Sequence, residues 1–172
     1  MSKKVIAFDL DGTLAPSKST LPDAMGLALS ELLRHKNVCV ISGGKFGQFE
    51  KQLLSNLKVE DSYLKNLHLM PTCGTRYYRH DKGGKWELVY AEDFKPEEKE
   101  KIINALNRGF DELGYREKTV YGECIEDRES QITFSVLGQD IVDVLGEKGV
   151  ELKEAWDPDN KKKLELRDYI AP

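Results

Sequence analysis

The chain has 172 residues and a mass of 19.6 kDa, the usual size of one domain or of one domain with a small insert. Hydrophobic residues make up 40% and charged residues 33%, which excludes a disordered, collagen-like or low-complexity chain. The net charge is −4, so there is no cationic excess for non-specific nucleic-acid binding. The sequence has no apolar stretch of membrane-spanning length, no signal peptide, and no zinc or disulfide spacing among its three cysteines. We therefore expect a cytoplasmic protein with no membrane or nucleic-acid partner.

Strands and helices alternate in the first part of the chain. Apolar runs at residues 4–8, 38–41 and 68–70 predict three buried strands. Apolar residues at helical spacing predict one helix from Pro22 to about His35, and a second one that carries Phe46, Phe49, Leu53 and Leu57. Such alternation predicts an α/β fold with a doubly wound parallel sheet.

The pattern changes after Gly74. Residues 75–80 and 85–91 flank Asp-Lys-Gly-Gly and predict a β-hairpin. A helix is expected from Pro96 to Gly114, a strand at 130–137 paired with 124–128, and a last helix that starts at Asp157-Pro158-Asp159. The run Lys161-Lys162-Lys163 on that helix indicates a solvated face, with a phosphate contact as the less favoured alternative. We therefore expect two modules, residues 1–74 and residues 75–172.

Two carboxylates, those of Asp9 and Asp11, follow the first strand directly. Ligands of open α/β sheets bind at the carboxyl ends of the strands, and Asp11 reaches that site only if the turn at Gly12 redirects it. Such a pair can hold Mg²⁺, attack phosphorus, and act as general acid and base. The alternative is a polar turn with an Asx cap. The full string at residues 8–14, behind an apolar strand, favours the functional interpretation.

The string Phe-Asp-Leu-Asp-Gly-Thr-Leu at residues 8–14 resembles the signature of the haloacid dehalogenase superfamily of phosphotransferases. The resemblance implies that Asp9 is the nucleophile and Asp11 the acid and base. It also implies Mg²⁺ bound by the Asp9 carboxylate and the Asp11 main-chain carbonyl. The second motif of that superfamily matches Ser42, which would hydrogen-bond the phosphoryl group, while Gly43 and Gly44 would let the backbone and the following helix N-terminus approach it. The alternative interpretation of Ser42-Gly43-Gly44 is a helix cap and a tight turn.

The second module also resembles a part of that superfamily. An insert follows the third strand there, so residues 75–172 resemble the larger α/β type of cap, an inserted α+β module, and residues 1–74 resemble an incomplete Rossmann-like core. Segments 42–53 and 125–139 resemble the branch that contains eukaryotic-type phosphomannomutases and bacterial sugar-phosphate phosphatases. The third and fourth superfamily motifs have no match, because no Gly-Asp dipeptide occurs in the chain.

Three residues are candidates for substrate contact by the same resemblance. Arg128 matches the branch, although a salt bridge with Glu126 or Asp127 is an equal alternative. Gln139 and Lys18 stand where phosphomannomutases have arginines at the phosphate sites. The loss of a bidentate guanidinium counts against a mutase.

The resemblance therefore implies Mg²⁺-dependent phosphoryl transfer on a sugar phosphate in carbohydrate metabolism, through an aspartyl-phosphate intermediate. A phosphatase is the favoured activity and a phosphomannomutase the close alternative, with a homodimer as a candidate assembly. A truncated, catalytically weak or inactive fragment that binds phosphate or a partner is the alternative from another class. A weaker alternative is a module like a response regulator, phosphorylated at the strand end as a signal.

Overall fold

The computed structural model describes residues 4–16 and 19–170 and divides into two compact units, Met1–Asp93 and Phe94–Pro172. The sequence predicts a boundary after Gly74, whereas the structural boundary lies after Asp93. The difference arises because the hairpin pairs with the sheet of the first unit. Among the described residues, no helix combines the length and the apolar character that a membrane crossing requires.

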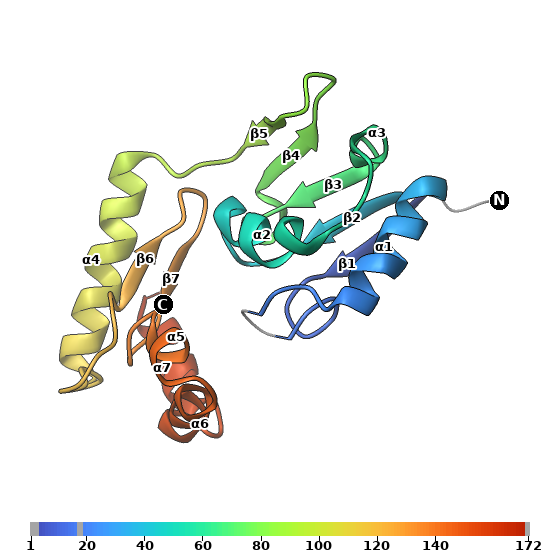
Figure 1. Cartoon of the computed structure of the whole chain (residues 1–172). Coiled ribbons are helices and arrows are strands. Elements are labelled where there is room, and N and C mark those ends of the chain that lie inside the picture. Colours follow the sequence, from blue (N-terminus) through green and yellow to red (C-terminus); the bar gives the residue numbers. More distant parts are fainter. Residues whose placement is uncertain (1–3, 17–18, 171–172) are drawn as a thin grey trace. The chain divides into compact units, whose positions relative to one another are not determined.

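Five strands of the first unit lie side by side in chain order, as Figure 1 shows. They are β1 (Val5–Asp9), β2 (Asn37–Ile41), β3 (Leu67–Met70), β4 (Arg76–His80) and β5 (Trp86–Ala91). The first three strands are parallel, and β4 and β5 are antiparallel to their neighbours. The α/β class is confirmed, but the sheet is mixed because a tight hairpin reverses the chain and so can only add antiparallel strands.

Helices cover one face of this sheet through a single apolar core. The helices are α1 (Asp23–His35), α2 (Phe46–Gln52) and α3 (Asp61–Leu64). Val40 and Leu69 point into that core, whereas Cys39 and His68 lie on the opposite face, because side chains alternate along a strand. The second predicted helix ends earlier than expected, since a short 3₁₀ turn, η1 (Leu54–Asn56), precedes Leu57.

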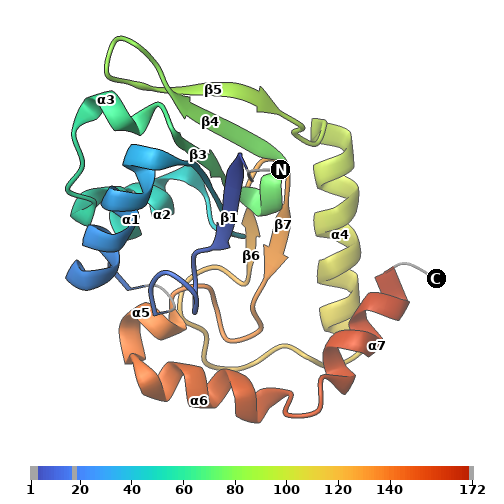
Figure 2. The same ribbon diagram turned by 90° about the vertical axis from the view of Figure 1, so that its right-hand side faces the viewer.

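The second unit holds a two-stranded sheet and four helices among its described residues. These elements are α4 (Pro96–Glu112), β6 (Ile125–Asp127), β7 (Ile132–Phe134), α5 (Ile141–Leu145), α6 (Glu147–Trp156) and α7 (Lys161–Ile170). Figure 2 shows α7 crossing one end of α4. A Cβ on Gly109 would lie 2.5 Å from Leu166 Cδ1, so this glycine permits the close approach of α4 and α7. The predicted hairpin and α4 are confirmed, whereas α5 and α6 were not predicted.

The last helix begins at Lys161, just after the predicted start at Asp157-Pro158-Asp159. The side chain of Asp157 is 3% exposed and accepts the backbone N–H groups of Lys162 and Lys163, each at 3.0 Å. This carboxylate therefore satisfies two of the N–H groups that a helix leaves unpaired at its first turn.

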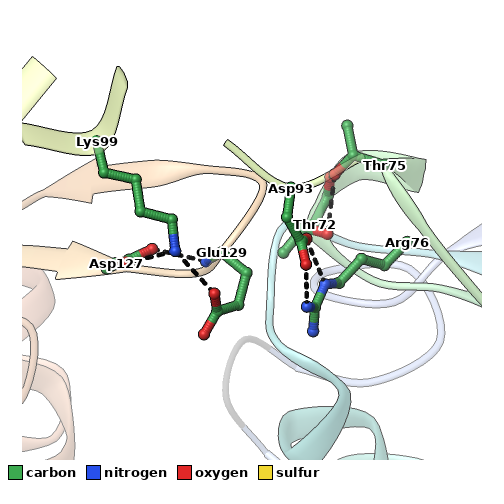
Figure 3. A network of polar contacts seen from close by, with 7 residues as sticks. All are labelled: Thr72, Thr75, Arg76, Asp93, Lys99, Asp127 and Glu129. Carbon is green, nitrogen blue, oxygen red and sulfur yellow. Dashed lines mark hydrogen bonds and ion pairs between the residues drawn. The ribbon is translucent and has the colours of Figure 1, made fainter. Parts of the chain in front are cut away.

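Ion pairs hold a strand or a loop to its neighbours within each unit. In the first unit, Arg76 donates two hydrogen bonds to Asp93, at 2.8 and 2.6 Å. In the second unit, Lys99 Nζ lies 2.9 Å from Asp127 Oδ2 and 2.7 Å from Glu129 Oε2 (Figure 3). These pairs fasten the end of the hairpin segment in one unit and the β6–β7 turn in the other.

Candidate functional site

The carboxyl ends of β1, β2 and β3 meet at one edge of the first sheet. Asp9 is in register with Ile41, and Ile41 with Met70. The polar segments that follow these three strands are therefore neighbours. Asp9 is exposed at this edge, whereas Ser42, directly after β2, is 5% exposed.

A tight turn after β1 redirects Asp11, as the sequence predicted. Gly12 has a φ of 78°, in the left-handed region, and its N–H donates to the carbonyl of Ala15 at 2.7 Å. The carbonyl of Leu10 accepts the N–H groups of Leu14 and Ala15, each at 3.0 Å. The chain thus folds back on itself, and the Asp11 side chain reaches the loop that follows β2.

The Asp11 carboxylate accepts hydrogen bonds from three side chains of that neighbouring segment. Ser42 Oγ lies 3.4 Å and Gln48 Nε2 3.5 Å from Asp11 Oδ2. Gln52 Nε2 lies 3.3 Å from Asp11 Oδ1. Sequence reasoning missed Gln48 and Gln52; their separation by four residues places them on one side of α2, and that spacing is the signal that could have found them.

The loop Ser42–Gly44 belongs to the same cluster. The Ser42 hydroxyl accepts the Gly44 N–H at 3.5 Å, besides donating to Asp11. A Cβ on Gly44 would lie 2.0 Å from Gln48 Oε1, so this glycine makes room for a side chain. At Gly43 a Cβ would come no nearer than 3.8 Å to Cys73 Sγ, an ordinary contact. The structure therefore gives the two glycines different surroundings.

The loop that follows β3 is hydrogen-bonded to the Ser42–Gly44 loop. The N–H of Thr72 donates to the carbonyl of Gly44, and that of Cys73 to the carbonyl of Ser42, both at 3.0 Å. Thr72 and Cys73 have φ values of 50° and 57°, and Gly74 has 89°. Left-handed backbone is strained for side chains other than glycine, and such strain gathers at functional sites. Thr75 Oγ1 donates to the Thr72 carbonyl at 2.6 Å and helps to fix the turn (Figure 3).

The predicted cap residues lie in the second unit or outside the described residues. Arg128 Nε and Nη2 each lie 2.8 Å from Glu126 Oε2, so the salt-bridge interpretation of this residue is confirmed. Gln139 Nε2 donates to the carbonyl of Cys124 at 3.3 Å. Lys18 lies outside the described residues.

The oxygen atoms of Asp9 and Asp11 at the end of β1 supply some of the ligands that a hard divalent cation needs. Asp9 offers an exposed carboxylate, and such oxygen ligands are those that Mg²⁺ prefers. The Asp11 carboxylate already accepts the three hydrogen bonds described above, so a contribution through its main-chain carbonyl fits this arrangement better than one through its side chain. Among residues 4–16 and 19–170, no group of three or more His, Cys, Asp or Glu side chains could hold a metal ion.

Comparisons with known proteins show the family and the fold of the chain. The family model for haloacid dehalogenase-like hydrolases matches residues 6–154. Among solved structures, the IMP-nucleotidase of Plasmodium falciparum is similar at 19% identity and a TM-score of 0.56, over 92% of this chain and 48% of that chain. Its ATP-bound form is similar at 17% identity and a TM-score of 0.55, over 92% and 41%. The chain thus spans about half of the length of these nucleotidases. No curated protein matches it.

Proposed function

Because the chain belongs to the family of haloacid dehalogenase-like hydrolases, we propose that it carries the catalytic carboxylates of a Mg²⁺-dependent phosphatase. The observation that supports this proposal most is the cluster at the end of β1. Asp9 is exposed there, and Asp11 is turned toward Ser42 on the adjacent strand end. The cluster thus combines a nucleophile, a proton-transferring group and a hydroxyl donor.

The proposed reaction has two steps that use the same two carboxylates. A carboxylate oxygen of Asp9 attacks phosphorus, and the bond between phosphorus and the ester oxygen breaks. Asp11 gives its proton to that leaving oxygen, so the alcohol departs neutral. Asp11 then takes a proton from water, whose oxygen attacks the phosphorus of the aspartyl phosphate. The bond to Asp9 breaks, and inorganic phosphate leaves.

The Asp9 carboxylate and the Asp11 main-chain carbonyl would hold Mg²⁺, which when bound would offset the negative charge of the phosphoryl oxygens. Ser42 would donate its hydroxyl to a phosphoryl oxygen once substrate displaces its hydrogen bond to Asp11, while Gly43 and Gly44 would let the backbone approach that group. Affinity for Mg²⁺ depends on the number of carboxylates. We therefore expect weak Mg²⁺ binding by this pair alone and slow turnover by the 172-residue chain.

Sugar phosphates are the substrates that we propose first, on the resemblance of segments 42–53 and 125–139. Nucleoside monophosphates are the second candidate class, because a structurally similar protein is an IMP-nucleotidase. A phosphomannomutase is less favoured: the guanidinium of Arg128 is bound to Glu126, and glutamine stands at position 139. A phosphate-binding module without turnover remains the alternative from another class.

A phosphate-release screen tests this proposal. The 172-residue chain and any longer form would be incubated with hexose phosphates, pentose phosphates and nucleoside monophosphates, each with Mg²⁺ and with a chelator. We expect Mg²⁺-dependent release that the Asp9→Asn variant lacks, and conversion of hexose 1-phosphate to 6-phosphate would indicate a mutase instead. Phosphate binding without release by any form would support the non-catalytic module, and release by the Asp9→Asn variant would refute the assigned nucleophile.

A further inference from the structure

We propose that Gln52, together with Gln48, is a positioning residue that holds the Asp11 carboxylate in place for proton transfer. This inference rests on the proposed function, since it assigns a role within the same reaction. Neither glutamine is a catalytic residue in the proposal, because an amide at neutral pH transfers no proton to the leaving oxygen. Both are proposed to act through Asp11.

The burial of Gln52 is the first observation behind this proposal. Its side chain is 4% exposed, between two members of the apolar core, Phe49 and Leu53, which are fully buried. A buried amide is unfavourable unless its donors and acceptors are paired. Gln52 donates to Asp11 at 3.3 Å and accepts from Gln48 at 3.2 Å. A polar side chain at this core position is therefore explained by the carboxylate that it reaches.

The geometry of the contacts is the second observation. Gln52 donates to Oδ1 of Asp11, whereas Gln48 and Ser42 donate to Oδ2. Donors on both oxygens oppose rotation of the carboxylate about its terminal bond. Asp11 stands on a tight turn after β1, and α2 adds two side-chain donors from outside that turn. Proton transfer is sensitive to such orientation, since a misplacement of 1 Å costs about 10²-fold in rate.

Gly44 supplies the third observation. Any Cβ at this position would lie 2.0 Å from Gln48 Oε1 and 2.6 Å from its Cδ. The loop therefore leaves the space that Gln48 needs to reach Asp11. A methyl group there would displace the end of a flexible side chain, so the space at Gly44 is a condition for the contact between Gln48 and Asp11.

The test compares two aryl phosphates that differ in their need for an acid. p-Nitrophenol is the more acidic leaving group and departs without help, whereas phenol leaves better when Asp11 protonates it. For Gln52→Met, we expect kcat on phenyl phosphate to fall by about tenfold or more. First-turnover release of p-nitrophenol should fall by less than about threefold, and KM should change little for both substrates. Lys51→Met, on the exposed side of α2, is the matched control.

A double-mutant cycle with Asp11→Asn completes the experiment. In that background, Gln52→Met should change turnover by less than about twofold, because the group that it positions is already lost. Gln52→Glu, which keeps the shape but replaces the donor with a negative charge, should be at least as slow as Gln52→Met. Gln48→Ala repeats the test at a less buried position, in case Gln52→Met does not fold.

The outcomes separate the two proposals. No Mg²⁺-dependent release of p-nitrophenol by the unmodified protein would refute the proposed function and this inference with it. Release by the unmodified protein, combined with equal losses on both substrates in the glutamine variants, would refute the inference alone. The inference would also be refuted if the effects of Gln52→Met and Asp11→Asn on turnover were fully additive.

Discussion

Each unit contains a carboxylate that is shielded from water, and the two are held in different ways. Asp157 in the second unit accepts two backbone N–H groups at 3.0 Å and is 3% exposed. Asp11 in the first unit is half-buried and accepts side-chain donors at 3.3–3.5 Å. Backbone donors of a helix are fixed by the helix itself, whereas side-chain donors can adjust. The comparison suggests one carboxylate for stability and one for chemistry.

The largest effect is expected when Asp11, the carboxylate of the first unit, is replaced. Asp11→Asn should lower turnover by about 10²–10⁴-fold, the usual contribution of a general acid and base. The free energy of unfolding should fall by about 1 kcal/mol or less, because the asparagine keeps the size and one acceptor oxygen of the carboxylate, whereas its NH2 group cannot accept from the donors on the other oxygen. Enzyme assays and urea denaturation measure the two quantities. A large loss of stability would place Asp11 with Asp157 as a structural group.

The converse test replaces Asp157, the carboxylate of the second unit. Asp157→Ala should destabilise the second unit by about 1–2 kcal/mol, since two N–H groups at the start of α7 lose their acceptor. Glu154→Ala, three residues away and exposed on α6, is the matched control and should cost less than about 0.5 kcal/mol. Thermal unfolding of each variant provides the measurement. Similar midpoints for both variants would contradict the assignment of Asp157 as the cap.

A smaller effect is expected in the strained turn after β3. Cys73 is exposed and has a φ of 57°, so its backbone carries a penalty that a glycine avoids. Cys73→Gly should leave stability unchanged or raise it by up to about 0.5 kcal/mol, because relief of strain outweighs the extra freedom of the unfolded chain. Cys73→Val should lower it by about 1 kcal/mol. Chemical denaturation of the three proteins ranks them, and a Val variant as stable as the Gly variant would show that the turn is relaxed.

The smallest effect concerns His68, a half-buried polar group on the sheet face opposite the core that α1, α2 and α3 form. Burial, with the charge of Arg79 as the lesser cause, lowers the pKa of His68 below its usual range, and His68 Nδ1 lies 2.7 Å from the Tyr77 hydroxyl. Below a pH of about 6.5, the unfolded chain therefore binds a proton that the folded chain resists. Stability should fall as the pH decreases from about 6.5 toward the lower folded pKa. His68→Gln should flatten that part of the profile, and an unchanged profile would exclude His68 as its source.

The strand ends of the site could be predicted from the sequence, because short motifs specify them. Asp9, Asp11 and Ser42 each follow an apolar strand, and parallel strands bring such ends together. Gln52 could not be predicted in the same way, since its partner Asp11 lies 41 residues away in the chain. Its side chain looks like any polar residue of an amphipathic helix until the tertiary contact is known.

The sequence pattern also did not predict which sheet the hairpin joins, nor the helices α5 and α6. The hydrogen bonds between β4 and β5 are local, so they do not reveal which sheet the pair joins. In α5 and α6, exposed Val144 and Val150 weaken the apolar periodicity, and Gly149 reads as a helix breaker. A Cβ at Gly149 would lie 2.5 Å from the carbonyl oxygen of Ile141, so close packing explains this glycine.

The order of the five strands in the first unit has a consequence for folding. Each strand pairs with the one that follows it in the chain, so no strand waits for a partner from a later part of the sequence. The parallel pairs close long loops, such as that between Val5 and Asn37, whereas the hairpin pair of His80 and Trp86 is local. During synthesis on the ribosome, β2 can pair with β1 as soon as it emerges, and β3 to β5 can follow one at a time. The site at the ends of β1, β2 and β3 can therefore form before the second unit has been translated.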